Sequence, residues 1–184
     1  MGLMGSLNLP AEVAPGPTKP AIRAIVLQRL AVAETDHVVD IGAGSGAVSI
    51  AAAQTAHRVT AIERDADRVD AIEENLDANT VSATVEVVHG EAPAALPDTA
   101  DAAFIGGSQR VTEVIAALDD VGVDRIVMPA ARLQTAARAI DCLDARGLLE
   151  EVLLVQVARG YDLANETALD GATPVYVLVG GEVA

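Results

Sequence analysis

The sequence of 184 residues is poor in the residue types that build disulfides and metal sites. Cys142 is its only cysteine, which excludes an intrachain disulfide and a cysteine-built metal site and is typical of a small buried apolar residue. The histidines His37, His57 and His89 lack ligand spacing, so we expect no metal. No stretch approaches the roughly 18 apolar residues that a membrane span needs.

The beginning of the sequence also lacks a targeting pattern. Residues 1–10 contain no basic region and no long apolar block, so we expect no signal peptide and a soluble, cytoplasmic protein without a membrane partner. The length fits one domain over residues 1–184, in which about residues 1–15 form a flexible N-terminal segment.

Basic residues are scarce, and lysine is scarcer still. Twenty-seven acidic residues oppose twelve basic ones, giving a net charge of −15, and Lys19 is the only lysine. Such a charge repels a phosphate backbone, so we expect no nucleic-acid partner. The same composition is typical of a halophilic protein, because strong salt screening weakens self-repulsion. The charge therefore says little about the substrate.

Strand-like and helix-like segments alternate along the chain, which predicts an α/β fold with a mostly parallel sheet. We expect strands at residues 37–41, 59–63, 84–88, 101–105 and 125–128, and helices near 20–30, 45–56, 65–76, 109–118 and 132–145. Two further strands, 148–158 and 174–179, are separated only by a polar loop, 159–173. Five βα units followed by two strands predict the seven-stranded, Rossmann-like class I methyltransferase sheet, whose last strand is antiparallel. A dinucleotide dehydrogenase would more often continue with βα units.

A glycine-rich turn, DIGAGSG at residues 40–46, follows the first strand. Glycine lets a chain bend sharply and lets a ligand touch the backbone, and the next helix presents free N–H groups. The glycines alone also fit a nicotinamide-dinucleotide site. Asp40 would oppose a pyrophosphate but could hold a methionine ammonium, and Gly46 completes a G-x-G-x-G spacing. Glu63 could accept both ribose hydroxyls. Together these features favour S-adenosyl-L-methionine.

Two segments beside the turn carry a closer resemblance. Gly-Pro-Thr-Lys at 16–19 and Ala-Phe-Ile-Gly-Gly-Ser at 103–108, with the turn between them, resemble the decarboxylating cobalt-precorrin-6B methyltransferase family of cobalamin biosynthesis in order and spacing. The resemblance implies methylation of carbon 15 of the macrocycle with loss of the ring C acetate carboxyl as carbon dioxide. It also implies a homotetramer and a separate partner that methylates carbon 5.

The motifs and this resemblance give the candidate site. Cofactor contacts are predicted at Thr18, Asp40, Gly42, Ala43, Gly44, Ser45, Gly46, Glu63, Arg64, Glu91 and Ala92. The tetrapyrrole substrate is anionic through its carboxylates, and the two glycines at the end of the fourth strand should clear space and expose backbone N–H groups to it. Substrate contacts are therefore predicted at Lys19, Arg23, Gly106, Gly107, Ser108 and Arg110. No residue is singled out as a catalytic acid or base.

Two other functions remain open from the sequence. Another class I methyltransferase, acting on tRNA adenine or on protein carboxyl groups, would share the cofactor turn. A basic surface patch would favour tRNA, whereas a deep cleft with Lys19 and Arg23 at its rim would favour the macrocycle. A non-catalytic subunit would bind S-adenosylmethionine without turning it over.

Overall fold

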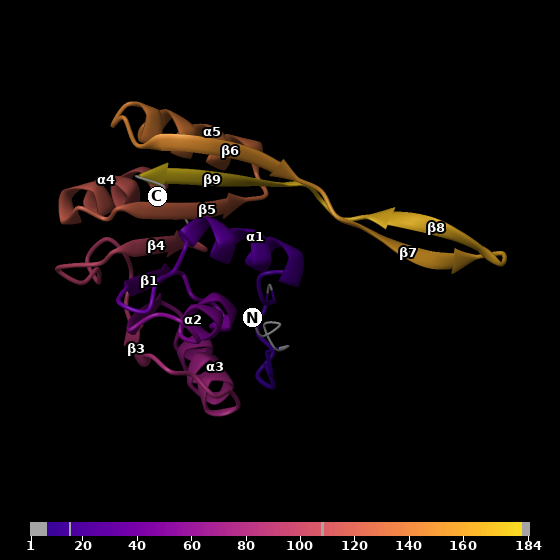
Figure 1. Cartoon of the computed structure of the whole chain (residues 1–184), viewed down its shortest axis with the longest axis horizontal. Helices are drawn as coiled ribbons and strands as arrows, with labels where there is room; N and C mark the ends of the chain where they lie inside the picture. The colour runs from indigo at the N-terminus through magenta and orange to yellow at the C-terminus, as the bar shows by residue number, and fades with distance from the viewer. Residues whose placement is uncertain (1–6, 15, 108, 182–184) are drawn as a thin grey trace.

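The computed structural model describes residues 7–14, 16–107 and 109–181. Its main feature is a seven-stranded sheet in the order β3-β2-β1-β4-β5-β9-β6 (Figure 1). Strand β9 is antiparallel to both of its neighbours, β5 and β6, and the other pairs are parallel. The predicted sheet is thereby confirmed. Its strands are β1 (His37–Ile41), β2 (Arg58–Glu63), β3 (Thr84–His89), β4 (Ala102–Ile105), β5 (Arg125–Ala130), β6 (Leu149–Val155) and β9 (Val175–Gly181).

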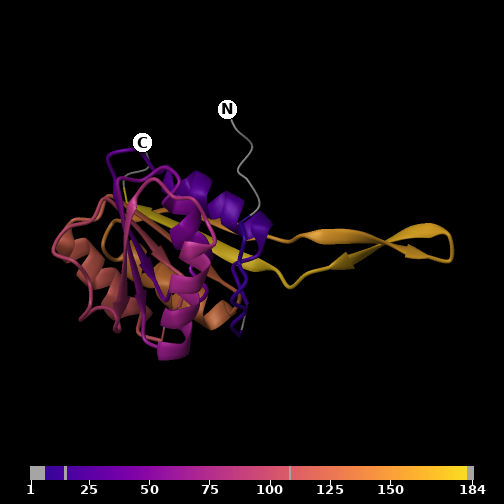
Figure 2. The same cartoon turned by 90° about the horizontal axis from the view of Figure 1, so that it is seen from below.

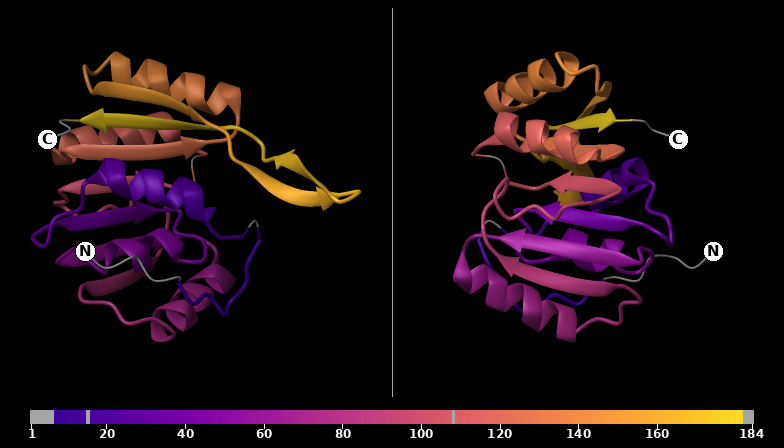
Figure 3. Two further views of the ribbon diagram at one scale, coloured as in Figure 1. Left: turned by 45° about the vertical axis from the view of Figure 1, so that its right-hand side comes forward. Right: turned by 90° about the vertical axis from the view of Figure 1, so that its left-hand side faces the viewer.

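Helices cover both faces of this sheet (Figure 3). One apolar cluster joins α1 (Pro20–Leu30) and α2 (Ala47–Ala52) to the sheet, and another joins α4 (Val111–Val121) and α5 (Leu133–Asp144) to it. Helix α3 (Ala66–Asp77) packs beside β2 and β3, and Asp65 caps it as predicted by accepting from the N–H groups of Asp67 and Arg68. The central strands β1 and β4 are almost entirely buried, which is why they read as short apolar runs.

Two predicted elements differ in the structure. Helix α2 begins at Ala47 and not at residue 45, because Gly46 has a φ of 75° and caps the helix from the turn, and it ends at Ala52 and not at residue 56. The predicted polar loop at 159–173 is wrong: it is a hairpin of β7 (Ala158–Leu163) and β8 (Glu166–Gly171). We call this hairpin the arm, since it extends beyond the sheet from the ends of β6 and β9 (Figure 2). Its two-residue turn has φ values of 56° at Ala164 and 64° at Asn165.

The segment before α1 lies against α3. The sequence predicts flexibility up to about residue 15, and the described part of that segment, residues 7–14, is hydrogen-bonded to Asn75 and Asn79. Its odd-numbered residues are half-buried and its even-numbered residues are exposed, as in an extended chain with one face on the protein. Residues 1–6 and 15 lie outside the described residues.

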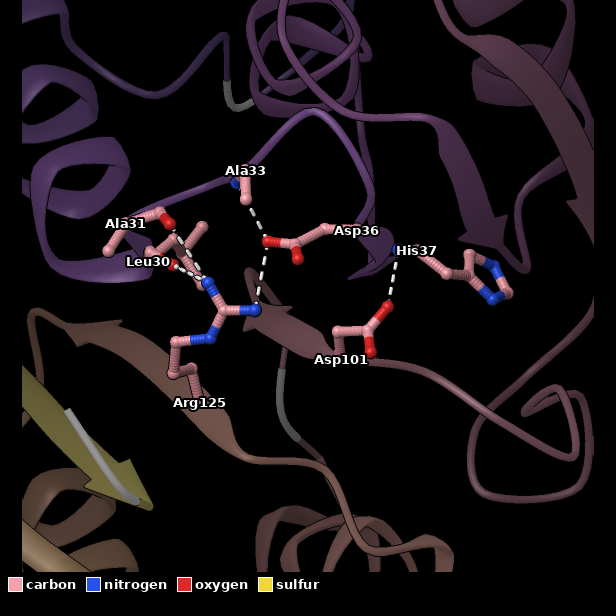
Figure 4. Close-up of polar contacts among 7 residues, drawn as sticks. All are labelled: Leu30, Ala31, Ala33, Asp36, His37, Asp101 and Arg125. Carbon is pink, nitrogen blue, oxygen red and sulfur yellow. Dashed lines mark hydrogen bonds and ion pairs between the residues drawn. The ribbon is translucent and has the colours of Figure 1, made fainter. Parts of the chain in front are cut away.

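A buried ion pair joins α1 to the sheet at the amino ends of β1, β4 and β5 (Figure 4). The Arg125 guanidinium donates to Asp36 at 2.8 Å and to the carbonyl oxygens of Leu30 and Ala31 at 3.0 and 2.9 Å. Because this cluster lies at the sheet edge opposite the carboxyl ends of the parallel strands, we assign it a structural role. No helix in the described part of the chain is long and apolar enough to cross a membrane.

Candidate cofactor and substrate site

A cavity of about 380 Å³ opens at the carboxyl ends of β1, β2 and β4. This is the edge at which open α/β sheets bind ligands, and the volume is within the range of small-molecule sites. Most of the predicted site residues line it: Thr18, Gly42, Ala43, Gly44, Ser45, Glu63, Arg64, Glu91, Ala92, Gly106, Gly107 and Arg110. Within the described ranges, no three His, Cys, Asp or Glu side chains gather as a metal site would require.

The glycine-rich turn forms one wall of the cavity. Gly42, Gly44 and Gly46 all have positive φ values, of 72°, 62° and 75°. A side chain at Gly42 would also place its Cβ 2.8 Å from the backbone nitrogen of Gly107. Glycine is therefore required there twice, for its conformation and for the close approach of the loop after β4.

Glu63 ties this turn to the end of β2. Its carboxylate is buried, and Oε2 accepts from the Gly44 N–H at 2.9 Å. Oε1 accepts from the N–H groups of Arg64 and Asp65 at 2.9 and 3.1 Å. The carboxylate is thus fixed at the cavity wall, and three of its four lone-pair sites are used, so one site, on Oε2, remains for a ribose hydroxyl. That contact stays a prediction.

Asp40 lies behind the turn and is not among the residues that line the cavity. Its side chain is 1% exposed, and Oδ2 accepts from the Ser49 N–H at 2.9 Å and from the Ser49 hydroxyl at 2.5 Å. Burial raises the pKa of Asp40 to about 6. The structure therefore shows Asp40 fixing the first turn of α2, and its predicted contact with a methionine ammonium stays untested.

Two buried side-chain oxygens, Asp40 Oδ1 and Ser45 Oγ, have no hydrogen-bond partner among the described residues. Ser45 lines the cavity, so its hydroxyl offers a polar contact to a ligand there. The Ser45 hydroxyl, the backbone of the glycine-rich turn and the Glu63 carboxylate together offer hydrogen-bond donors and acceptors that fit an amino acid joined to a nucleoside, as in S-adenosylmethionine. Gly46 lies at the start of α2 and is not among the residues that line the cavity.

The glycine pair after β4 acts differently from the prediction. Both glycines are exposed at the cavity, but their N–H groups donate to the carbonyl oxygen of Ile41, at 2.8 and 3.2 Å, so the predicted free N–H donors to substrate are already used within the protein. A Cβ at Gly106 would lie 2.8 Å from a ring carbon of Phe104, so packing requires glycine there, and the predicted clearing of space for substrate stays a prediction. The end of the neighbouring strand β1 accepts from both N–H groups, and residue spacing in the sequence alone could not show this. Ser108 lies outside the described residues.

Four arginines line the cavity, although the chain carries a net charge of −15. Arg64 forms an ion pair with Glu91 at 3.3 Å, and Arg110 pairs with Glu113. The other two, Arg68 in the first turn of α3 and Arg132 before α5, were missed by the sequence reasoning. Both lie at helix starts that follow strands of the parallel sheet, and that position is the signal that could have found them.

Lys19 and Arg23 are not among the described residues that line the cavity. Lys19 is exposed and precedes α1. Arg23 donates from Nη1 to the carbonyl oxygen of Thr18 at 2.9 Å, and burial lowers its pKa. Arg23 therefore supports the segment that lines the cavity, and a direct substrate contact of either residue stays a prediction.

The sheet order, the reversed strand β9 and the glycine turn facing Glu63 are those of the class I methyltransferase fold. A family model described as precorrin methyltransferase domain matches residues 16–180. The chain belongs to this family, and it is an enzyme. Fold and family together imply S-adenosyl-L-methionine as the methyl donor.

Curated relatives match over nearly the whole chain. A Halobacterium salinarum protein is 48% identical over 177 residues, which cover 96% of this chain and 95% of that protein. A Methanosarcina mazei protein is 34% identical, covering 92% and 95%. Both are named probable cobalt-precorrin-6B C(15)-methyltransferase (decarboxylating).

Solved structures give the same family. The precorrin 8W decarboxylase of Methanobacterium thermoautotrophicum superposes with a TM-score of 0.84 at 30% identity, covering 91% of this chain and 93% of that one. The precorrin-6Y C5,15-methyltransferase of Geobacter metallireducens gives 0.83 at 32%, covering 94% of each. A tRNA (m1A58) methyltransferase from Aquifex aeolicus gives 0.72 at 13%, covering 95% and 72%, which shows a shared fold alone.

Proposed function

We propose that this enzyme methylates carbon 15 of cobalt-precorrin-6B and decarboxylates the ring C acetate, giving cobalt-precorrin-7 in cobalamin biosynthesis. The observation that carries the proposal is the 48% identity, over 96% of the chain, to a relative of that name. The arginines of the cavity support it, because an anionic macrocycle needs cationic partners and four of the twelve basic residues of the chain line this cavity.

In this proposal the chain acts mainly by positioning. Glu63 orients the ribose, and the backbone from Gly42 to Ser45 holds the amino-acid end of the cofactor. S-adenosylmethionine supplies an electrophilic methyl group, and a displacement at such a group depends on alignment with the attacking carbon. Arg110 and Arg132 bind substrate carboxylates. Loss of carbon dioxide leaves its bonding electrons to the conjugated ring, so no strong base is required of the protein.

The direct test mixes the purified enzyme, S-adenosylmethionine and cobalt-precorrin-6B. We expect a product that has gained one methyl group and lost one carboxyl, with release of carbon dioxide. Cofactor binding without either change would support a non-catalytic subunit instead. Methyl transfer to unmodified tRNA or to protein carboxyl groups, with none to the macrocycle, would support another class I methyltransferase.

The arginines are tested separately. Arg132→Gln should raise KM for the macrocycle about tenfold with a smaller change in kcat, since one charge-assisted hydrogen bond to a carboxylate contributes about 1.5 kcal/mol. Arg138→Gln, on the same helix and outside the cavity, is the matched control. An unchanged KM in Arg132→Gln would show that this arginine does not bind substrate.

We also propose a homotetramer, for which the arm is the supporting observation. The large exposed apolar side chains of the described residues lie at the start of α5, on β6 and on the arm: Leu133, Val152, Leu154, Tyr161, Leu163 and Leu169. A two-stranded ribbon is marginally stable alone, and contact with other copies would bury its apolar side chains. Light scattering should give a tetramer for the unmodified chain and a smaller species for Leu169→Glu. Thr55→Glu, an equal change of charge at an exposed site off the arm, should stay tetrameric.

The remaining proposals concern the surroundings of the enzyme. We infer that it works in the cytoplasm of a cell with high internal salt, and that a separate protein methylates carbon 5. The product of this enzyme alone should then lack the carbon 5 methyl group. Its melting temperature should rise between about 0.1 M and about 1 M KCl, as the screening length falls from about 10 Å to about 3 Å.

A further inference from the structure

Asn75 of α3 and Asn79, two residues beyond the end of that helix, hold residues 7–14, which we call the strap. Asn75 Oδ1 accepts from the Ala11 N–H at 2.9 Å, and its Nδ2 donates to the Ala11 carbonyl at 3.2 Å. Asn79 pairs in the same way with Asn8, at 3.1 and 2.6 Å. The two asparagines are four residues apart at the end of α3, and the side chains of both face the strap. Each side-chain amide supplies one donor and one acceptor to the backbone of the extended strap, as a neighbouring strand would.

Asn75 makes one further contact that Asn79 does not. Its Nδ2 also donates, at 2.9 Å, to the carbonyl oxygen of Ser45 in the glycine-rich turn. The Asn75 side chain is completely buried, and both of its amide protons and its oxygen are used. The additional bond of Asn79 goes to the Asn75 carbonyl oxygen in the last turn of α3, at 2.7 Å. Among the described contacts, Asn75 therefore joins the strap to the cofactor turn.

Both partners of Asn75 lead to the cavity. Ser45 lines it directly, and the chain beyond the strap lines it with Gly16, Pro17 and Thr18. The Gly16 N–H donates to the Val13 carbonyl at 2.7 Å, which ties this wall to the end of the strap. A ligand in the cavity therefore contacts two walls, the glycine-rich turn and the segment Gly16–Thr18. The buried Asn75 amide connects these walls through Ser45 and the strap. Fixing one wall restricts the other, because both bonds depend on the orientation of the same side chain.

We propose that Asn75 is a positioning residue that couples S-adenosylmethionine binding at the glycine-rich turn to the ordering of the strap. Cofactor contact with the turn fixes the Ser45 carbonyl and hence the Asn75 amide. The amide then fixes Ala11 and the wall formed by Gly16–Thr18. By reciprocity, the strap strengthens cofactor binding by as much as the cofactor strengthens the strap. The inference rests on the cofactor and is independent of which macrocycle is the substrate.

The test compares the unmodified chain with Asn75→Ala and Asn79→Ala. Hydrogen exchange of the amides in residues 7–14 is followed by mass spectrometry with and without S-adenosylmethionine, and cofactor Kd is measured by calorimetry. In the unmodified chain we expect the cofactor to slow exchange in the strap, although residues 7–14 do not line the cavity. Asn75→Ala should lose most of that slowing and bind the cofactor about tenfold more weakly, which corresponds to about 1.4 kcal/mol.

Asn79→Ala is the matched control, because it removes an equal pair of strap bonds and no bond to the turn. It should speed exchange in the strap without cofactor, keep the slowing on cofactor addition, and change Kd less than about threefold. Asn75→Asp is the second variant, since it keeps the acceptor for the Ala11 N–H and lacks the amide donor to the carbonyl oxygens of Ser45 and Ala11. It should resemble Asn75→Ala in Kd.

Hydrogen exchange of the unmodified chain tests the coupling even if the Asn75 variants do not fold. Cofactor binding without slower exchange in the strap would refute the coupling and leave the methyltransferase assignment intact. Equal effects of Asn75→Ala and Asn79→Ala on Kd would refute the specific role of Asn75. A failure of the unmodified chain to bind the cofactor would contradict the cofactor assignment itself.

Discussion

Gly42 lies where the glycine-rich turn crosses the loop after β4, which makes Gly42→Ala a sharp test of how this site is built. Two costs add at that position. A non-glycine residue at a φ of 72° costs about 1–2 kcal/mol. The new Cβ would lie 2.8 and 3.0 Å from the backbone nitrogen and Cα of Gly107, which cannot rotate away, and such overpacking costs about 1–3 kcal/mol. We expect a total loss of about 2–5 kcal/mol in the free energy of unfolding.

Two other glycines separate these costs. Gly122 has a φ of 76° and nothing within 4 Å of its virtual Cβ, and it lies at the end of α4. Gly44 has a φ of 62° and its nearest neighbour at 4.0 Å. Alanine at either position should cost about 1–2 kcal/mol, from the backbone conformation alone.

Urea unfolding at constant salt measures all three variants, with midpoints and slopes compared. Because Gly42→Ala pushes the turn away from the loop after β4, its affinity for S-adenosylmethionine should also fall at least about tenfold, whereas Gly122→Ala should bind normally. Equal stability of the Gly42 and Gly122 variants, within about 0.5 kcal/mol, would refute the argument that the two loops are in contact.

Three further changes have definite expected outcomes. Arg125→Met should lower the free energy of unfolding by about 3–5 kcal/mol, because it leaves the Asp36 carboxylate buried and unpaired, while Arg58→Met at an exposed pair should cost under about 1 kcal/mol in the same urea titration. The pKa of Asp40 is raised to about 6 in the folded chain, so its contribution to stability is present below the unfolded pKa near 4 and is lost as the pH rises through about 6. The free energy of unfolding of the unmodified chain, minus that of Asp40→Asn, should therefore fall between about pH 4 and about pH 6. A difference that does not change with pH would contradict this. Glu63→Gln should weaken S-adenosylmethionine binding about tenfold or more by calorimetry, because the charged acceptor of a ribose hydroxyl is lost.

The arm and the arginines show where pattern reasoning failed. The turn at Ala164 and Asn165 has two positive φ values but no glycine, and the strands of the arm expose nearly all their side chains, so neither a turn signal nor an apolar alternation marked it. Arg68 and Arg132 look like ordinary surface charges in the sequence. They become site residues because their helices begin at the same sheet edge as the glycine-rich turn.

The sequence by itself determined the seven strands of the main sheet, the glycine-rich turn and the type of cofactor. These depend on local properties: buried parallel strands are apolar runs, and positive φ values in a tight turn select glycine. The tertiary structure alone decided where polar groups find their partners. The Gly106 and Gly107 N–H groups donate to Ile41, the Asp40 carboxylate accepts from Ser49, and the Asn75 amide bridges two segments more than 30 residues from one another. Such pairings depend on which elements become neighbours when the sheet assembles, and residue spacing along the chain does not indicate those neighbours.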